Sequence, residues 1–134
     1  DAQGVVSAEA VAQAIRPDTL IASIMQVNNE LGSVSDIAAI AKTGRQRGVL
    51  SHTDAAQRYG RVAVDVKALD VDLLSLSGNK IYGPKGVGAL YVRRAEGLTL
   101  DPQIHGGGHE MGMRSGTLPT HQIVGLAAAA KLMH

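Results

Sequence analysis

The sequence predicts an α/β fold in which a mainly parallel sheet is covered by helices. Three observations support this prediction: an apolar run at 20–27, an amphipathic helical segment at 36–47, and further strand-like runs at 49–54, 71–77 and 86–93. Strand, helix and strand in this order form a right-handed βαβ unit with parallel strands. The length of 134 residues, with 45% apolar and 19% charged side chains, suits a single globular domain.

The first two elements are a short helix and a strand. Ser7 can cap a helical segment at 8–15, which Pro17 ends. The apolar run at 20–27 lies between polar turn residues, and this pattern predicts a buried strand. The polar segment at 28–32 is expected to form a turn or loop at the carboxyl end of that strand.

A second helix and a second strand follow. Ser35 is the expected cap of the helix at 36–47, whose apolar residues fall on one stripe. Gly48 is expected to close this helix. The next strand, at 49–54, ends on a carboxylate, and residues 66–69 are expected to form one helical turn.

The second half of the chain contains two strands, a glycine-rich region and a helix. The strands at 71–77 and 86–93 are joined through a turn that contains Gly-Pro-Lys-Gly. An alanine-rich helix is expected at 118–134, with Thr117 as its cap and Pro119 tolerated in its first turn. Many of the 16 glycines gather between positions 78 and 116, where the backbone must turn sharply or approach a ligand.

Composition excludes several classes of function. The net charge is +1 with both signs interspersed, so neither a nucleic-acid face nor a polybasic segment is expected. No apolar run approaches the roughly 20 residues of a membrane span, and no signal-peptide pattern opens the chain. The absence of cysteine excludes disulfides and a cysteine nucleophile within these residues, and His105 and His109 lack the regular ligand framework of a metal site. The cytoplasm is the expected compartment.

Four polar residues end or follow predicted strands. Asn29 lies just past the first strand, Asp54 ends the second, and Ser77 and Lys80 lie at the end of the third. In a parallel sheet, ligands bind beyond the carboxyl ends of the strands. These four side chains are therefore expected to converge on one site.

Lys80 and Asp54 suggest cofactor chemistry. A deprotonated lysine forms an imine with an aldehyde, and desolvation or a cationic neighbour favours that state. A carboxylate at the end of an apolar strand can pair with a pyridine nitrogen and keep it protonated. Gln57 could donate to the ring oxygen of such a cofactor, and Ser77 to a phosphate. Simpler interpretations remain open: a surface lysine, a turn-capping aspartate, and local turn hydrogen bonds.

Four motifs, in their order and spacing, resemble those of the cysteine desulfurases. They are SIMQVNNELG at 23–32, HTDAAQ at 52–57, SLSGNKIYGPKGVGALYVRR at 75–94 and HGGGHEMGMRSGT at 105–117. The lysine motif alone indicates the wider group of class V aminotransferase-like, fold-type I enzymes that use pyridoxal 5'-phosphate (PLP). The glycine-rich motif narrows the resemblance to the desulfurases, and it implies the fold of the PLP-dependent transferase large domain.

The resemblance implies catalytic and ring-binding roles for four residues. Lys80 would form the internal aldimine with PLP and then move protons on the substrate carbon as general base and acid. Asp54 would hold the pyridine nitrogen. Gln57 and Asn29 would contact the side of the ring that carries the oxygen.

The resemblance also implies phosphate ligands, with one departure from the family pattern. Ser77 would bind the phosphate, and Thr117 would reach the phosphate of the other subunit in a homodimer. Asn79 stands where the family usually has a histidine as a phosphate ligand, so weaker cofactor binding is expected. Met111 stands where many members carry an arginine, with no assigned consequence.

Residues 1–134 would be a single partial domain, the core of the large domain. The resemblance implies that the N-terminal part of that domain, the C-terminal small domain and the loop with the catalytic cysteine lie outside these residues. Desulfurase activity is therefore not expected of this segment alone. Apolar faces and sheet edges are expected to be exposed.

The implied function is the conversion of L-cysteine to L-alanine, with the sulfur passed as a persulfide to a sulfur-acceptor scaffold protein for iron–sulfur cluster or related assembly. A selenocysteine lyase or another class V carbon–sulfur lyase is the first alternative. A non-catalytic remnant that keeps the fold but binds no cofactor is the second. The sequence of the C-terminal segment, and whether it carries a cysteine loop, would distinguish a desulfurase from the first alternative. PLP binding would distinguish it from the second.

Overall fold

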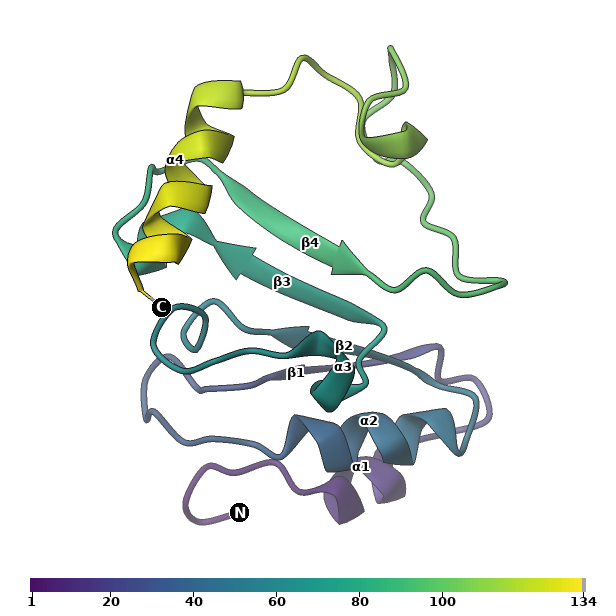
Figure 1. Ribbon diagram of the computed structural model, residues 1–134. Coiled ribbons are helices and arrows are strands. Elements are labelled where there is room, and N and C mark those ends of the chain that lie inside the picture. The colour runs from purple at the N-terminus through teal and green to yellow at the C-terminus, as the bar shows by residue number, and fades with distance from the viewer. Residues whose placement is uncertain (134) are drawn as a thin grey trace.

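The computed structural model describes residues 1–133 and contains one four-stranded sheet in the order β1-β2-β3-β4 (Figure 1). The first three strands pair in parallel, and β4 pairs antiparallel with β3. The predicted mainly parallel α/β sheet is therefore confirmed. The strands are β1 (Ile21–Met25), β2 (Leu50–Asp54), β3 (Leu73–Ser77) and β4 (Gly88–Val92).

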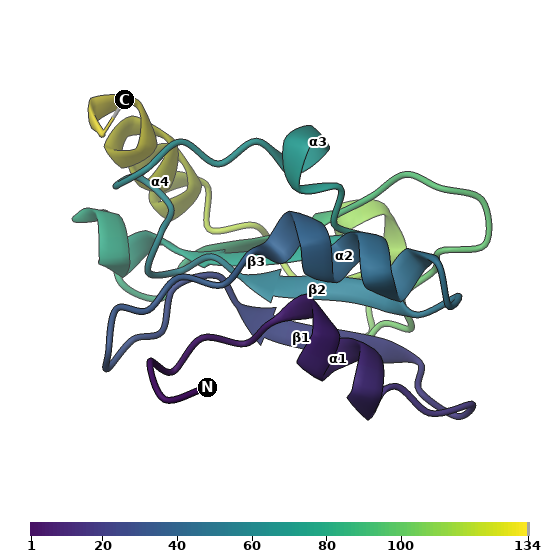
Figure 2. The same ribbon diagram turned by 90° about the horizontal axis from the view of Figure 1, so that it is seen from below.

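Three helices cover one face of this sheet. Figure 2 shows α1 and α2 in front of β1 and β2, with α3 near α2. The longest helix, α4, lies apart from them and contacts the short turn η1 that follows β3. None of the helices in residues 1–133 is long and apolar enough to cross a membrane. The helices are α1 (Ala8–Ala14), α2 (Ile37–Arg45), α3 (Val66–Leu69) and α4 (Thr120–Leu132), and the 3-10 turns are η1 (Gly78–Ile81) and η2 (Glu110–Gly112).

The cap of α2 differs from the prediction. Asp36, rather than Ser35, caps this helix, and its Oδ1 accepts a hydrogen bond of 3.1 Å from the backbone N–H of Ala39. Ser35 is buried, and its hydroxyl oxygen accepts a hydrogen bond of 3.3 Å from the backbone N–H of Val6. Ser35 therefore anchors the N-terminal segment, which leaves the capping role to the next residue.

Two other expectations are corrected. Pro119 lies at the N-cap of α4 without a side-chain hydrogen bond, so Thr117 is not the cap. The strand at 20–27 is not buried: β1 is an edge strand in which Ile21 is 41% exposed. The predicted end of the last helix, His134, lies outside the described residues.

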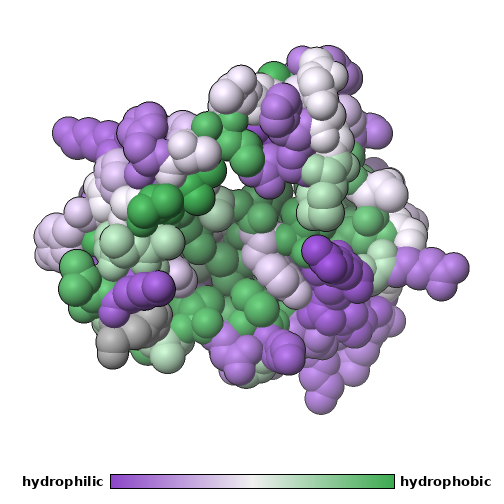
Figure 3. All heavy atoms as spheres, turned by 45° about the horizontal axis from the view of Figure 1, so that its top comes forward, coloured by the Kyte–Doolittle hydropathy of each residue, from purple (hydrophilic) through white to green (hydrophobic). Residues whose placement is uncertain are grey.

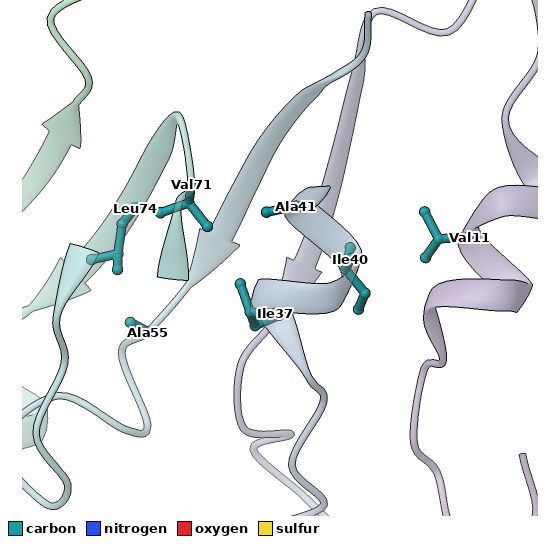
Figure 4. Packing of buried hydrophobic residues seen from close by; sticks show 7 residues of the cluster. All are labelled: Val11, Ile37, Ile40, Ala41, Ala55, Val71 and Leu74. Carbon is teal, nitrogen blue, oxygen red and sulfur yellow. The ribbon is translucent and has the colours of Figure 1, made fainter. Parts of the chain in front are cut away.

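The core lies between α2 and the side of the sheet that faces the helices (Figure 4). Side chains alternate between the two faces of a strand. Thr53 and Ala55 are fully buried toward the helices, whereas His52 and Asp54, at the alternating positions, are half-buried. His52 and Asp54 therefore lie on the face away from these helices. The buried cluster consists of Val11, Ile37, Ile40, Ala41, Ala55, Val71 and Leu74.

Two arginines and two aspartates fasten the start of β3. Arg93 contacts Asp70 at 2.7 Å and Asp72 at 3.3 Å, and Arg45 contacts Asp70 at 3.1 Å. The buried Asp72 also accepts hydrogen bonds from the backbone and hydroxyl of Ser51 at 2.8 and 2.9 Å. The hydrogen bond from Arg93 lowers the pKa of Asp70, so this carboxylate contributes stability that is lost as the pH falls through the lowered pKa.

We expect Asp72→Ala to lower the free energy of unfolding of the full-length protein by about 3 kcal/mol, because it leaves the buried N–H of Ser51 without its acceptor and removes one acidic partner of Arg93. Urea unfolding measures this change. Asp18→Ala is the matched control, since the Arg16–Asp18 pair is 72% exposed on both sides and should change stability by less than about 0.5 kcal/mol. Equal effects of the two substitutions would contradict the prediction.

Candidate functional site

The carboxyl ends of three parallel strands meet at one edge of the sheet. Met25 of β1 lies in register with Asp54 of β2, which lies in register with Ser75 of β3. Two backbone hydrogen bonds of 2.9 Å continue this pairing, from Gln26 N–H to the Asp54 carbonyl and from Ala55 N–H to the Ser75 carbonyl. Side chains that project from this edge are therefore held at a fixed spacing.

Asp54 is oriented by the turn that it begins. Its Oδ1 accepts a hydrogen bond of 2.8 Å from the backbone N–H of Ala56. A carboxylate has two oxygens, and this turn engages Oδ1. The turn-capping and the cofactor-binding interpretations of Asp54 are therefore compatible with each other.

Ser77, Asn79 and Lys80 lie on the turn that follows β3. Ser77 is the last residue of the strand, and Asn79 and Lys80 belong to η1, where both are exposed. The Ser77 hydroxyl donates to Asn79 Oδ1 at 2.5 Å. Because the acceptor side of this amide is engaged, its Nδ2 hydrogens are the groups that Asn79 offers to an anion.

This turn rests on a close-packed support. Backbone hydrogen bonds of 2.9 Å join Gly78 N–H to the Val87 carbonyl and Gly83 N–H to the Gly78 carbonyl. A Cβ atom at Gly78 would lie 3.0 Å from Val87 Cγ1 and 3.1 Å from the Pro84 carbonyl oxygen. Gly125 of α4 packs on Pro84, since a Cβ atom there would lie 2.6 Å from Pro84 Cγ. The backbone that presents Lys80 is thus held from two sides.

The other predicted residues lie in three loops. Asn29 is exposed in the turn after β1, where its Nδ2 donates to Glu30 Oε1 at 2.7 Å. Gln57 is half-buried in the turn after Asp54. Both loops follow strand ends at the same sheet edge as η1, whereas the exposed Thr117 lies on a different segment, just before α4.

His52, to which the sequence suggested no role, links the three parallel strands. Its Nδ1 lies 2.7 Å from Ser23 Oγ, and its Nε2 lies 3.2 Å from Ser75 Oγ. Burial lowers the pKa of His52 more than the nearby Asp54 carboxylate raises it, so the ring is neutral at neutral pH. Polar residues at alternating positions of apolar strands are the only sequence signal of this bridge, and they reveal the partners only once the register is known.

These side chains fit the three polar features of PLP. The Lys80 amine suits an aldehyde, and the Asp54 carboxylate suits a basic ring nitrogen. The Asn79 amide offers Nδ2 hydrogens of the kind that phosphate oxygens accept, and the Ser77 hydroxyl offers its own once it turns from Asn79 Oδ1. The donor set at the sheet edge therefore has the composition that PLP requires.

An open groove of about 560 Å³ lies elsewhere, between β4 and η2. Figure 3 shows apolar side chains gathered around a hollow on the side that carries β4, and Leu90 and Met111 are 50% and 75% exposed. Exposed apolar side chains were expected from the sequence. The groove contains none of the predicted site residues, so the strand ends define the candidate site. Its lining residues are Leu90, Tyr91, Val92, Arg93, Arg94, Glu110, Met111 and Met113.

A mainly parallel, helix-covered sheet with a lysine-bearing turn at its carboxyl edge matches part of the large domain of fold-type I PLP-dependent transferases. Comparison with protein families identifies the family within that class. The chain belongs to the aminotransferase class-V family, whose model matches residues 1–134.

The named relatives are cysteine desulfurases. The chain is 58% identical to cysteine desulfurase IscS of Shewanella baltica (strain OS223) over 131 residues, which cover 98% of this chain and 32% of that protein. It is 57% identical to IscS of Azotobacter vinelandii (strain DJ) over 129 residues, with 96% and 32% covered. The solved structure of SspA in complex with cysteine matches with a TM-score of 0.93 at 50% identity, over 98% of this chain and 38% of that chain. The predicted resemblance is confirmed, and the chain spans about a third of the length of its curated relatives.

We expect Gly78→Ala to destabilise the full-length protein by about 1–3 kcal/mol, because the new methyl group meets Val87 and the Pro84 carbonyl in a packed turn. Gly107→Ala is the matched control: its methyl group would approach only the exposed His109 ring, at 2.9 Å, and that ring can move. Urea unfolding compares the two variants. A loss of stability for Gly107→Ala as large as that for Gly78→Ala would show that the turn is not specially constrained.

Proposed function

We propose that this chain is the PLP-binding core of a cysteine desulfurase, which converts L-cysteine to L-alanine and passes on the sulfur as a persulfide. One observation carries the proposal: Lys80 and Ser77 lie on the turn at the end of β3, at the sheet edge where Asp54 ends the neighbouring strand. The desulfurases among the relatives, and the structure of SspA in complex with cysteine, support cysteine as the substrate class.

Lys80 is the catalytic amine in this proposal. Its exposed position on η1 lets the side chain reach a ligand at the sheet edge, while the packed Gly78 behind it fixes the backbone. Lys80 Nζ would hold the cofactor at its aldehyde carbon, with loss of one water, and once displaced by the substrate amine it would take and return protons at the substrate carbon. An amine acts as a base only when deprotonated, so the proposal requires that water be excluded from Lys80 when the site is filled.

Asp54 holds the proton on the ring nitrogen in this proposal. Its Oδ1 is bound to the Ala56 N–H, and Oδ2 would be the oxygen that pairs with the ring nitrogen. When bound, PLP supplies a protonated ring that withdraws electrons from the substrate carbon. Gln57, three residues further along, and Asn29, past the end of β1, donate amide hydrogens to the side of the ring that carries the oxygen.

Ser77 and Asn79 bind the phosphate in this proposal, and Thr117 serves a second subunit. The amide supplies neutral donors at the start of η1, and the hydroxyl becomes a second donor once it turns from Asn79 Oδ1 to the phosphate. Thr117 is exposed and lies on the segment before α4, not in a loop that directly follows a parallel strand, which suits contact with the phosphate of a partner copy. The proposed assembly is therefore a homodimer.

The sulfur acceptor comes from outside these residues. The chain contains no cysteine, so the proposed persulfide forms on a cysteine that lies elsewhere in the protein. The sulfur would then pass to an acceptor scaffold protein for iron–sulfur cluster or related assembly. We place this activity in the cytoplasm, with no nucleic-acid or membrane partner.

Lys80→Ala tests the proposal in the full-length protein. Wild-type protein mixed with PLP should develop the yellow absorbance of bound cofactor, and borohydride should fix the cofactor covalently. We expect both signals to disappear in Lys80→Ala, since no other amine replaces Nζ. Lys85→Ala is the matched control, because Lys85 is exposed in the same connection between β3 and β4 and should keep both signals. Absence of both signals from the wild type would favour a remnant of the fold that binds no cofactor.

Asn79→His should tighten PLP binding by about fivefold, because a charged donor to phosphate is stronger by roughly 1 kcal/mol than a neutral one. Equilibrium titration of the full-length apoprotein measures the dissociation constant. The gain should be largest at low pH and should fade as the new histidine loses its proton. A gain that does not depend on pH would mean that charge is not its cause.

A further inference from the structure

The bridge formed by Ser23, His52 and Ser75 runs diagonally across the sheet toward Asp54. His52 lies in register with Ser23, whereas Ser75 lies in register with Asp54 on the adjacent strand. All four residues are on the face of the sheet opposite the buried Thr53. The bridge therefore connects the register pair of Ser23 and His52 to the register pair that contains Asp54.

The roles of the two serines follow from the state of the ring. A neutral imidazole has one N–H donor and one acceptor nitrogen, so one serine donates to it and the other accepts from it. Nε2 faces Ser75, the register partner of Asp54, so a proton on Nε2 is the arrangement that the negative charge of Asp54 would favour. In that tautomer the Ser23 hydroxyl donates to Nδ1, and Nε2–H donates to Ser75 Oγ. The Ser75 hydroxyl hydrogen is then free to turn toward its register partner, Asp54.

A second contact matters to Asp54 because one hydrogen bond leaves a carboxylate free to rotate. The Ala56 N–H holds Oδ1 at 2.8 Å and fixes one end of the group. A Ser75 hydroxyl held by the half-buried ring of His52 on the neighbouring strand would be a second, rigid donor for the same carboxylate. An unpaired imidazole in this position would cost about 1–3 kcal/mol, so the bridge is also a stable arrangement.

We propose that His52 is a positioning residue, which acts through Ser75 to orient the Asp54 carboxylate toward the ring nitrogen of PLP. This inference rests on the proposed function and adds a residue to its site. His52 does not touch the cofactor. Its contribution lies in the direction that Asp54 faces.

The test compares His52→Ala, His52→Gln and wild type in the full-length protein. We expect His52→Ala to weaken PLP binding about tenfold to a hundredfold, by analogy with the loss that follows when the hydrogen-bond partner of a metal-binding side chain is removed. The pH titration of the cofactor's visible absorbance should shift as well, because Asp54 no longer holds the ring-nitrogen proton as firmly. His52→Gln should recover most of the affinity, since its amide can donate to Ser75 from near the Nε2 position.

Thr53→Val is the matched control for simple loss of stability. Thr53 is the next residue on β2, faces the helices, and donates its hydroxyl to the Ile24 carbonyl at 2.9 Å. It should destabilise the protein while leaving PLP affinity and the absorbance titration unchanged. If His52→Ala behaves like Thr53→Val in all three measurements, the bridge is only structural and the inference is overturned.

A replacement variant and the behaviour of the wild type distinguish the possible outcomes. If His52→Ala does not fold, Ser75→Ala takes its place with the same expected loss of affinity. Failure of the proposed function would look different, because the wild type itself would then lack the absorbance that depends on Lys80. Cofactor binding by the wild type, with unchanged affinity in the bridge variants, would overturn only the role of His52.

Discussion

The candidate site depends on the parallel register of β1, β2 and β3. Parallel pairing brings the carboxyl ends of the strands to one edge, and a slip of one residue would turn every side chain to the opposite face. The burial of Thr53 and Ala55 against the helices determines which face of the sheet forms the core and which face carries the candidate site. The same alternation therefore builds the core and presents Asp54 beside Ser75.

The fold was predictable where a local pattern determines it. The helical turn Val66–Leu69 was predicted with the bounds that the structure has, and the strand at 49–54 differs from β2 by one residue. The cap of α2 was not predictable, because Ser35 and Asp36 are both good capping residues. The choice between them depends on the contact of Ser35 with Val6, which lies 29 residues away in the sequence.

The candidate site was also predictable only where a local sequence pattern determines it. Asp54, Ser77 and Lys80 stand at strand ends within recognisable motifs, so each could be proposed from the sequence. His52 looks like any half-buried histidine until the register shows that Ser23 and Ser75 lie on either side of it. A network that spans three strands is encoded in the pairing of the strands, and no single segment of sequence contains it.

The described chain fixes the geometry of the proposed site but does not enclose it. Lys80 and Asn79 are exposed to water in this chain. The attraction between Asp54 and a protonated ring nitrogen would be stronger if water were excluded from the site. Exposed apolar side chains such as Leu90 and Val124 provide surface on which covering segments or a second subunit could pack. Geometry and exclusion of water therefore come from different parts of the protein. This sheet sets the direction in which each group points, and the reactivity of the lysine requires the assembled protein.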